Sequence, residues 1–175
     1  MMEGISAEEI EGIEDFIFRL SEAQLNEWKA NLKVKQPYVY TVFTRFINKN
    51  QMPNEQDTLF RILFVVLKCF DVYGFELPSF TEKEMSKYDV KWRQQMTAGI
   101  GEVHRNNIIK VGETVHQGTI SAYIHDKCIE KDAPNSQTSY VKTEMKFNTL
   151  SVVVLMYGSK IEDLLRHQNN TLSKQ

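Results

Sequence analysis

The most apolar stretch of the chain, residues 58–74, predicts a helix at the centre of a bundle. Its uninterrupted apolar run extends only from Ile62 to Leu67, far short of the ~20 residues that a membrane-spanning helix needs. Most of its helical wheel is apolar, which is typical of a helix contacted by several neighbours. Its polar residues share one narrow stripe, which Phe64 interrupts: Asp57, Arg61, Lys68 and Asp71. We therefore expect a buried core helix, with a partner-binding face as the alternative and no membrane anchor.

The helical spacing of apolar residues predicts further helices at 6–20, 21–35, 37–48 and 81–96. Three of them open with a capping box, in which the cap residue and the third helical residue satisfy each other's backbone donors. The pairs are Ser6 with Glu9, Ser21 with Gln24, and Thr81 with Glu84. The helix at 37–48 starts at a proline, which suits a first helical turn. Its apolar residues on one side are Tyr38, Val42, Phe43 and Phe46.

The second half of the chain is compatible with more than one secondary structure. Residues 108–124 read equally as parts of two helices or as a β-hairpin, a known ambiguity of short apolar runs. We favour helices because the upstream chain is helical, and the hairpin gives an alternative α+β class. Residues 132–139 read as a loop, and residues 140–168 read as one long helix or as a helix broken near Gly158. The β-branched start of the run at 152–157 also allows a strand.

The resulting prediction is a mainly α, single-domain helical bundle of about seven helices. The domain covers residues 1–168, with a hinge near 75–80, and residues 169–175 form a flexible tail. An internal duplication of a helix pair is a further hypothesis. It compares residues 36–47 followed by 58–67 with residues 117–129 followed by 149–158, because their apolar positions fall alike. If the duplication is real, the two most apolar helices, which contain residues 58–67 and 149–158, should pack against each other.

Composition and charge narrow the class of protein. The 175 residues are 42% hydrophobic and 25% charged, which is typical of a soluble globular domain. The net charge of −2 and the pI of about 6.1 lack the basic excess of a dedicated nucleic-acid binder. The acidic N-terminus has no signal-peptide pattern, so we expect a cytoplasmic protein whose two cysteines are free thiols.

Candidate metal ligands gather in the segment from His104 to Cys128. Glu113 and His116 stand at helical i, i+3 spacing, and so do His125 and Cys128. A carboxylate-bridged di-metal site in a bundle needs the Glu-x-x-His pair twice, and only one copy is present. A solvated segment of mixed polarity explains the same residues, so we expect no metal or other cofactor.

A basic strip is the candidate for nucleic-acid binding. Lys83, Lys87 and Lys91 repeat every four residues, and Arg93 lies beside them. Acidic neighbours dilute the strip, so a solvated helix face is the simpler explanation.

These patterns favour a non-enzymatic binding or regulatory module that acts through a helical surface, on another protein or by self-association. Its aromatic inventory supplies contact anchors as well as core. The alternatives are a nucleic-acid-associated accessory factor that uses residues 83–93, and a metal-dependent enzyme that uses residues 104–128.

Overall fold

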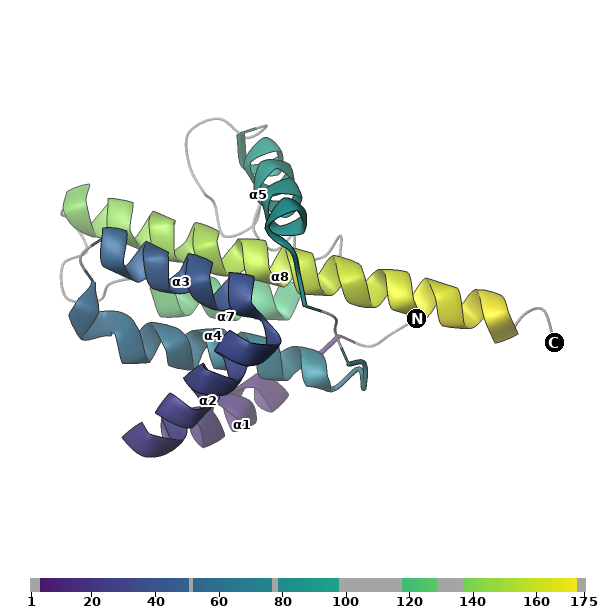
Figure 1. The fold of residues 1–175 in the computed structure, drawn as a ribbon, viewed down its shortest axis with the longest axis horizontal. Helices are drawn as coiled ribbons and strands as arrows, with labels where there is room; N and C mark the ends of the chain where they lie inside the picture. The colour runs from purple at the N-terminus through teal and green to yellow at the C-terminus, as the bar shows by residue number, and fades with distance from the viewer. Residues whose placement is uncertain (1–3, 51, 77–78, 98–117, 129–136, 173–175) are drawn as a thin grey trace.

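The computed structural model describes residues 4–50, 52–76, 79–97, 118–128 and 137–172, and these residues form a helical bundle (Figure 1). Within them the chain has seven α-helices, one short 3-10 helix and no strand, which confirms the predicted mainly α fold. The elements are α1 (Ala7–Phe18), α2 (Glu22–Lys35), α3 (Pro37–Lys49), η1 (Pro53–Glu55), α4 (Gln56–Asp71), α5 (Glu82–Thr97), α7 (Gly118–Cys128) and α8 (Gln137–Leu172).

The helix starts follow the local sequence signals. In α1 the Glu9 N–H donates to Ser6 Oγ at 3.2 Å, and the Ser6 N–H donates to the Glu9 carboxylate at 2.8 Å. The same reciprocal pair of hydrogen bonds caps α2, between Ser21 and Gln24, and α5, between Thr81 and Glu84. These hydrogen bonds favour the charged form of the acid, so they lower the pKa of Glu9 and of Glu84. All three predicted capping boxes are confirmed.

Helix α4 is the core of the bundle, as predicted. It contacts α1, α2, α7 and α8, and in Figure 1 it runs lengthwise through the molecule with the other helices around it. Because neighbours lie on several sides, burial extends round most of its circumference. Its buried residues are Leu59, Phe60, Ile62, Leu63, Phe64, Val65, Val66, Cys69 and Phe70.

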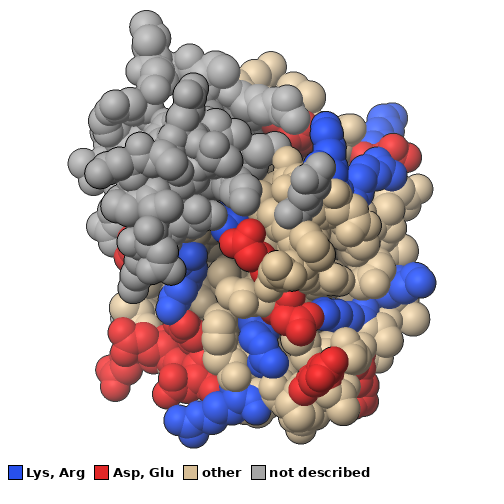
Figure 2. All heavy atoms as spheres, turned by 90° about the vertical axis from the view of Figure 1, so that its left-hand side faces the viewer, with Lys and Arg blue, Asp and Glu red and all other residues tan. Residues whose placement is uncertain are grey.

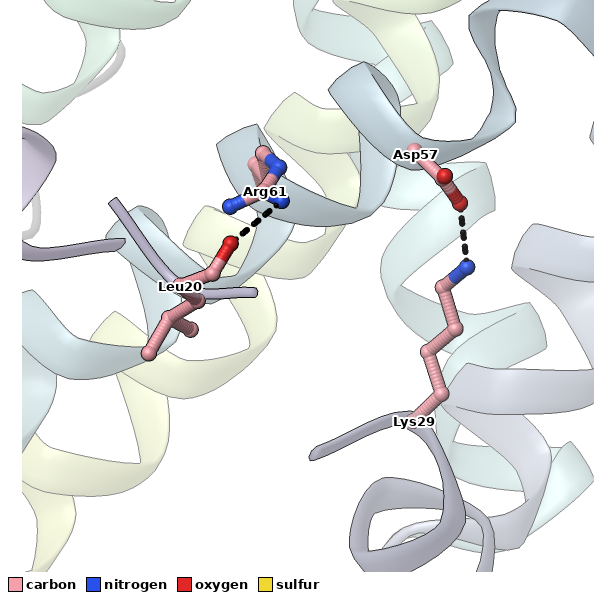
Figure 3. A network of polar contacts seen from close by, with 4 residues as sticks. All are labelled: Leu20, Lys29, Asp57 and Arg61. Carbon is pink, nitrogen blue, oxygen red and sulfur yellow. Dashed lines mark hydrogen bonds and ion pairs between the residues drawn. The ribbon is translucent and has the colours of Figure 1, made fainter. Parts of the chain in front are cut away.

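The polar stripe of α4 lies against the turn that joins α1 to α2. The Arg61 guanidinium donates to the backbone oxygens of Ile17 at 2.6 Å and of Leu20 at 2.8 Å. Asp57 pairs with Lys29 of α2 at 2.5 Å, and Figure 3 shows this pair and the hydrogen bond from Arg61 to Leu20. Phe64, which interrupts the stripe, is covered by the edge of Trp28, with ring centroids 5.4 Å apart. The N-terminal half of the stripe therefore makes the polar contacts that hold α1 and α2 against α4.

Helix α8 is continuous from Gln137 to Leu172. The predicted alternatives of a break near Gly158 and of a strand at 152–157 are therefore wrong, and the helix begins inside the segment predicted as a loop. Burial explains the continuity, because residues 150–157 are buried against the other helices. The helix runs past the bundle at the right of Figure 1. Residues 169–172 of the predicted tail are helical and exposed, and the flexibility of the tail stays a prediction.

Helix α7 contradicts the hairpin alternative over the part that the structure describes. Residues 118–124, which would supply the second strand, are helical, with Ile120 and Ile124 fully buried. Helical spacing places these two side chains on one face toward the core, and α7 packs along α8. Residues 108–117 lie outside the described residues.

The most apolar stretch, residues 58–74, does touch the run at 149–158 that the duplication hypothesis compares with part of it. The rings of Phe70 in α4 and Tyr157 in α8 stack with centroids 5.7 Å apart. The backbones of α7 and α8 approach closely along their length, whereas α3 reaches α4 mainly through the ring contacts of Tyr40 and Phe43 with Phe60. The duplication stays a prediction.

The connection after α4 is held to the bundle at its far end. Gly74 has φ +69° just after the helix, the left-handed conformation in which glycine commonly ends a helix. The Phe80 ring is buried against Tyr157, with centroids 5.1 Å apart. The buried side chain of Gln36, between α2 and α3, accepts a hydrogen bond from the Phe80 N–H at 3.1 Å. A hinge near 75–80 stays a prediction.

Candidate functional site

Helix α3 carries more apolar surface than the bundle covers. Its buried side chains are Val39, Phe43 and Ile47, which share one face. Tyr38 and Val42 stay 40% and 38% exposed. The sequence placed these two with Phe43 on one apolar side, and the structure corrects that assignment. Which part of a broad apolar arc is buried depends on the positions of α2 and α8, which contact α3, and helical spacing alone does not fix this.

The exposed residues of α3 form a stripe that is apolar at one end and basic at the other. Tyr38, Val42, Arg45 and Lys49 are all exposed. At 3.6 residues per turn they fall within an arc of ~60°. We call these four residues the α3 stripe. Its apolar half is at the N-terminal end of the helix and its basic half is at the C-terminal end.

The α3 stripe lies on a stack of aromatic rings. Phe43 lies beneath it and contacts Phe46 and Phe60, with ring centroids 6.2 and 5.3 Å apart. Tyr40 also meets Phe60, at 5.9 Å. Aromatic pairs of this kind contribute about 0.5–1.5 kcal/mol beyond the area that they bury. The stripe therefore lies over a packed part of the core and on a helix, which favours precise contacts with a partner.

Charge is segregated along the first 54 residues. Residues 1–27 contain eight acidic side chains and one basic one, Arg19, whereas residues 28–54 contain five basic side chains and no acidic one. The basic residues are Lys29, Lys33, Lys35, Arg45 and Lys49. The near-neutral net charge of the whole chain hides this contrast, and a comparison of successive windows reveals it. The acidic part includes α1, and the basic part includes the end of α2 and all of α3.

Two of these basic residues make contacts with other residues of the chain. Lys29 pairs with Asp57, and its ammonium lies 5.0 Å from the centre of the Phe60 ring. The Lys33 ammonium lies 5.8 Å from the centre of the Tyr40 ring. Among the residues that the structure describes, Lys35, Arg45 and Lys49 are exposed and form no ion pair. The positive charge next to the α3 stripe is therefore open to an acidic partner.

Figure 2 shows how charge is spread over one face of the molecule. Acidic side chains gather at its lower left corner, and elsewhere on the described part of this face the two signs are interspersed. The described part of this face thus carries no broad field of positive charge, which is the usual electrostatic footprint of a nucleic-acid surface.

The predicted metal ligands are only partly described. Glu113, His116 and His104 lie outside the described residues. His125 Nδ1 lies 3.2 Å from the Asp126 carboxylate, whereas Cys128 points into the core and is buried. Burial raises the pKa of the Cys128 thiol to about 12, so near pH 7 it stays protonated and lacks the thiolate that binds metal or attacks a substrate. No cluster of three metal-ligating side chains occurs in the described ranges, and the metal site stays a prediction.

The predicted nucleic-acid strip lies on α5. Lys83 and Lys87 are exposed there, one turn apart. Lys91 and Arg93 belong to the same helix, and their side chains lie outside the part that the structure describes. Exposed Glu82 adjoins the strip, as the sequence indicated, so nucleic-acid binding also stays a prediction.

Comparisons with models of known protein families, with curated protein sequences and with solved structures found no match. In the described part of the chain, none of the helices combines the length and the apolar character needed to cross a membrane.

Proposed function

We propose that the chain is a non-enzymatic protein-binding module that docks its partner on the α3 stripe. The observation that carries this proposal is the pair of exposed apolar side chains, Tyr38 and Val42, on α3 beside the exposed cations Arg45 and Lys49. Tyrosine and arginine are the residue types that most often dominate binding energy in protein interfaces. A cytoplasmic setting is part of the proposal.

The surface supports docking of a helix in particular. Apolar side chains one turn apart on α3 present a ridge of the kind that packs between the side chains of a second helix. The flanking cations can pair with carboxylates at the rim, where charges set orientation and association rate more than affinity. Partner choice would then depend on acidic residues that accompany an apolar anchor.

Substitution of Val42 by Glu tests the proposal. The change places a carboxylate in the apolar half of the stripe, and because Val42 is already exposed it should leave the fold intact. Wild-type and Val42→Glu proteins would be used for affinity capture from the native host, with partners quantified by mass spectrometry, and for light scattering. We expect the variant to lose the captured partner, or self-association if the partner is another copy.

Val90→Glu is the matched control, because Val90 is also an exposed valine in a helix, on α5. It should retain all binding. If Val42→Glu retains every partner and the same mass in solution, the α3 stripe is not a docking surface. The nucleic-acid and metal alternatives stay predictions, and neither gains a further observation from the described residues.

A further inference from the structure

Helix α1 has an exposed stripe whose character is opposite to that of the α3 stripe. Glu8, Glu11, Asp15 and Phe18 are exposed and fall within an arc of ~80° at 3.6 residues per turn. We call them the α1 stripe. It is acidic at the N-terminal end of the helix and ends in Phe18, which is 39% exposed.

Contacts within the chain leave most of this stripe free. The buried face of α1 is formed by Ile10 and Ile17 and packs on α4. Glu9 is occupied by the capping box and Glu14 pairs with Lys127 of α7, but neither residue belongs to the stripe. Within the described ranges, Glu8 and Glu11 form no ion pair.

The remaining carboxylate of the stripe is only weakly engaged. Asp15 faces Arg19 at 3.8 Å, and both side chains are more than three-quarters exposed. Such a surface pair contributes little to stability. Glu8 lies in the first turn, where it also favours the helix dipole, whereas Glu11 and Asp15 lie beyond the reach of that effect.

The α1 and α3 stripes match when their helices run antiparallel. At 1.5 Å per residue, the α1 stripe is about 15 Å long and the α3 stripe about 16 Å. In this orientation Phe18 meets Tyr38 at the apolar end, and Glu8 and Glu11 meet Lys49 and Arg45. Asp15, which faces Arg19 of its own chain at 3.8 Å, falls opposite Val42. A parallel arrangement would instead set carboxylates against Tyr38, so charge and apolar contact select one direction.

The two stripes do not pair within one molecule. Helix α1 packs on α4 and α7, whereas α3 packs on α2 and α8. In Figure 1 α1 lies at the lower edge of the bundle and α3 lies above it. A contact between the stripes therefore joins two different molecules, and each molecule still presents one free stripe of each kind.

We propose that the α3 stripe binds the α1 stripe of a second copy of this chain, so that copies associate head to tail. The inference rests on the proposed function and adds the identity of the partner. Each molecule carries one stripe of each kind, so the contact can be satisfied reciprocally in a closed dimer or a larger ring, or it can continue to open assemblies. The ion pairs lie at the rim, so association should weaken with salt, because the Debye length falls from about 10 Å at 0.1 M to about 3 Å at 1 M.

Charge reversal on each stripe gives the decisive test. One variant carries Arg45→Glu with Lys49→Glu, and the other carries Glu8→Lys with Glu11→Lys. Each alone sets like charges against each other and should stay at the mass of one chain, 20.4 kDa, at concentrations where the wild type is larger. Mixing the two variants restores opposite charges at every contact, so mass should rise again in light scattering and sedimentation.

The control is Lys83→Glu with Lys87→Glu, which changes the net charge by the same amount as Arg45→Glu with Lys49→Glu, on exposed positions of α5. It should associate like the wild type. Circular dichroism would establish that every variant keeps its helix content. A wild-type protein that stays at 20.4 kDa at high concentration and low salt overturns the inference, and so does a mixture that stays monomeric. If in that case Val42→Glu still abolishes capture of another protein, the docking function stands and only the identity of the partner is wrong.

Discussion

Replacement of Arg61 tests whether the junction of α1, α2 and α4 depends on its guanidinium. Arg61 makes two charge-assisted hydrogen bonds, to the backbone oxygens of Ile17 and Leu20, and Figure 3 shows the one to Leu20. The last carbonyls of a helix lack partners inside it, and α1 has no basic residue in its own last turn. A guanidinium delivered from α4 therefore satisfies these groups and favours the negative end of the helix dipole.

The magnitude follows from the two hydrogen bonds. Each hydrogen bond to a charged group contributes roughly 1.5–3 kcal/mol. The Ile17 oxygen also accepts the Leu20 N–H at 3.3 Å, so it keeps one partner after the substitution. We therefore expect Arg61→Met to lower the free energy of unfolding by about 2–4 kcal/mol. Each 1 kcal/mol corresponds to a fall in Tm of roughly 2–4 °C for a chain of this size.

The assay is urea unfolding followed by far-ultraviolet circular dichroism, with Arg166→Met as the matched control. Arg166 pairs with Glu162 one turn away on the exposed surface of α8, and such pairs contribute only about 0.3–0.5 kcal/mol. Arg61→Lys retains the charge but not the fork of two donors, so it should lie between the wild type and Arg61→Met. If Arg61→Met loses no more than the Arg166→Met control, the guanidinium is not what holds the junction.

The remaining predictions concern backbone conformation and pH. Gly74→Ala should destabilise the protein by about 1–2 kcal/mol because its φ is +69°, whereas Gly12→Ala, with open space around the added carbon inside α1, should stabilise it by about 0.5–1 kcal/mol. Urea unfolding measures the change in the free energy of unfolding for both variants, and two changes of the same sign would contradict the reasoning. Burial raises the pKa of the Cys128 thiol from 9.0 to about 12. The unfolded chain therefore releases this proton at lower pH than the folded one, and stability should fall as pH rises from 9 to 12. In Cys128→Ala the part of this fall in the free energy of unfolding that the thiol causes should disappear. If the free energy of unfolding falls with pH as steeply as in the wild type, the thiol is not its source.

Local signals in the sequence predicted the fold well. A capping box involves residues three apart, so Ser6 and Glu9 are recognisable without any tertiary information. The central position of α4 follows from apolar residues on nearly all sides, since such a helix needs several neighbours to cover it. The number and type of helices depend mainly on signals of this kind.

Contacts distant in the sequence were not predictable. The sequence shows the polar stripe that contains Arg61 but not what it contacts, because its two backbone acceptors, at the end of α1 and in the turn after it, lie more than 40 residues away. The run at 152–157 reads as strand or helix because β-branched residues suit either when they are buried. Tertiary packing on α8 decides this case, and a local pattern cannot.

The candidate site was visible in the sequence only in part. Tyr38 and Val42 were recognised as apolar positions of a helix, but their exposure depends on which side of α3 the bundle covers. The contrast between residues 1–27 and 28–54 is present in the sequence, yet motif spacing does not reveal it because no short motif carries it. The residues chosen for metal chemistry were found by spacing alone, and Cys128 proved to be a core residue.

The contact between Arg61 and the end of α1 also sets an order of events during synthesis. A ribosome releases α1 and α2 first, but the group that completes the C-terminal end of α1 follows 44 residues after Ile17. Lys29 likewise cannot form its ion pair until Asp57, which is 28 residues later, has been synthesised. A nascent chain that ends before α4 contains α1, α2 and α3, but it lacks the helix on which α1 packs and the partners of the Ile17 oxygen and of Lys29. The N-terminal part of this protein is made first but can reach its final structure only after the central helix has emerged.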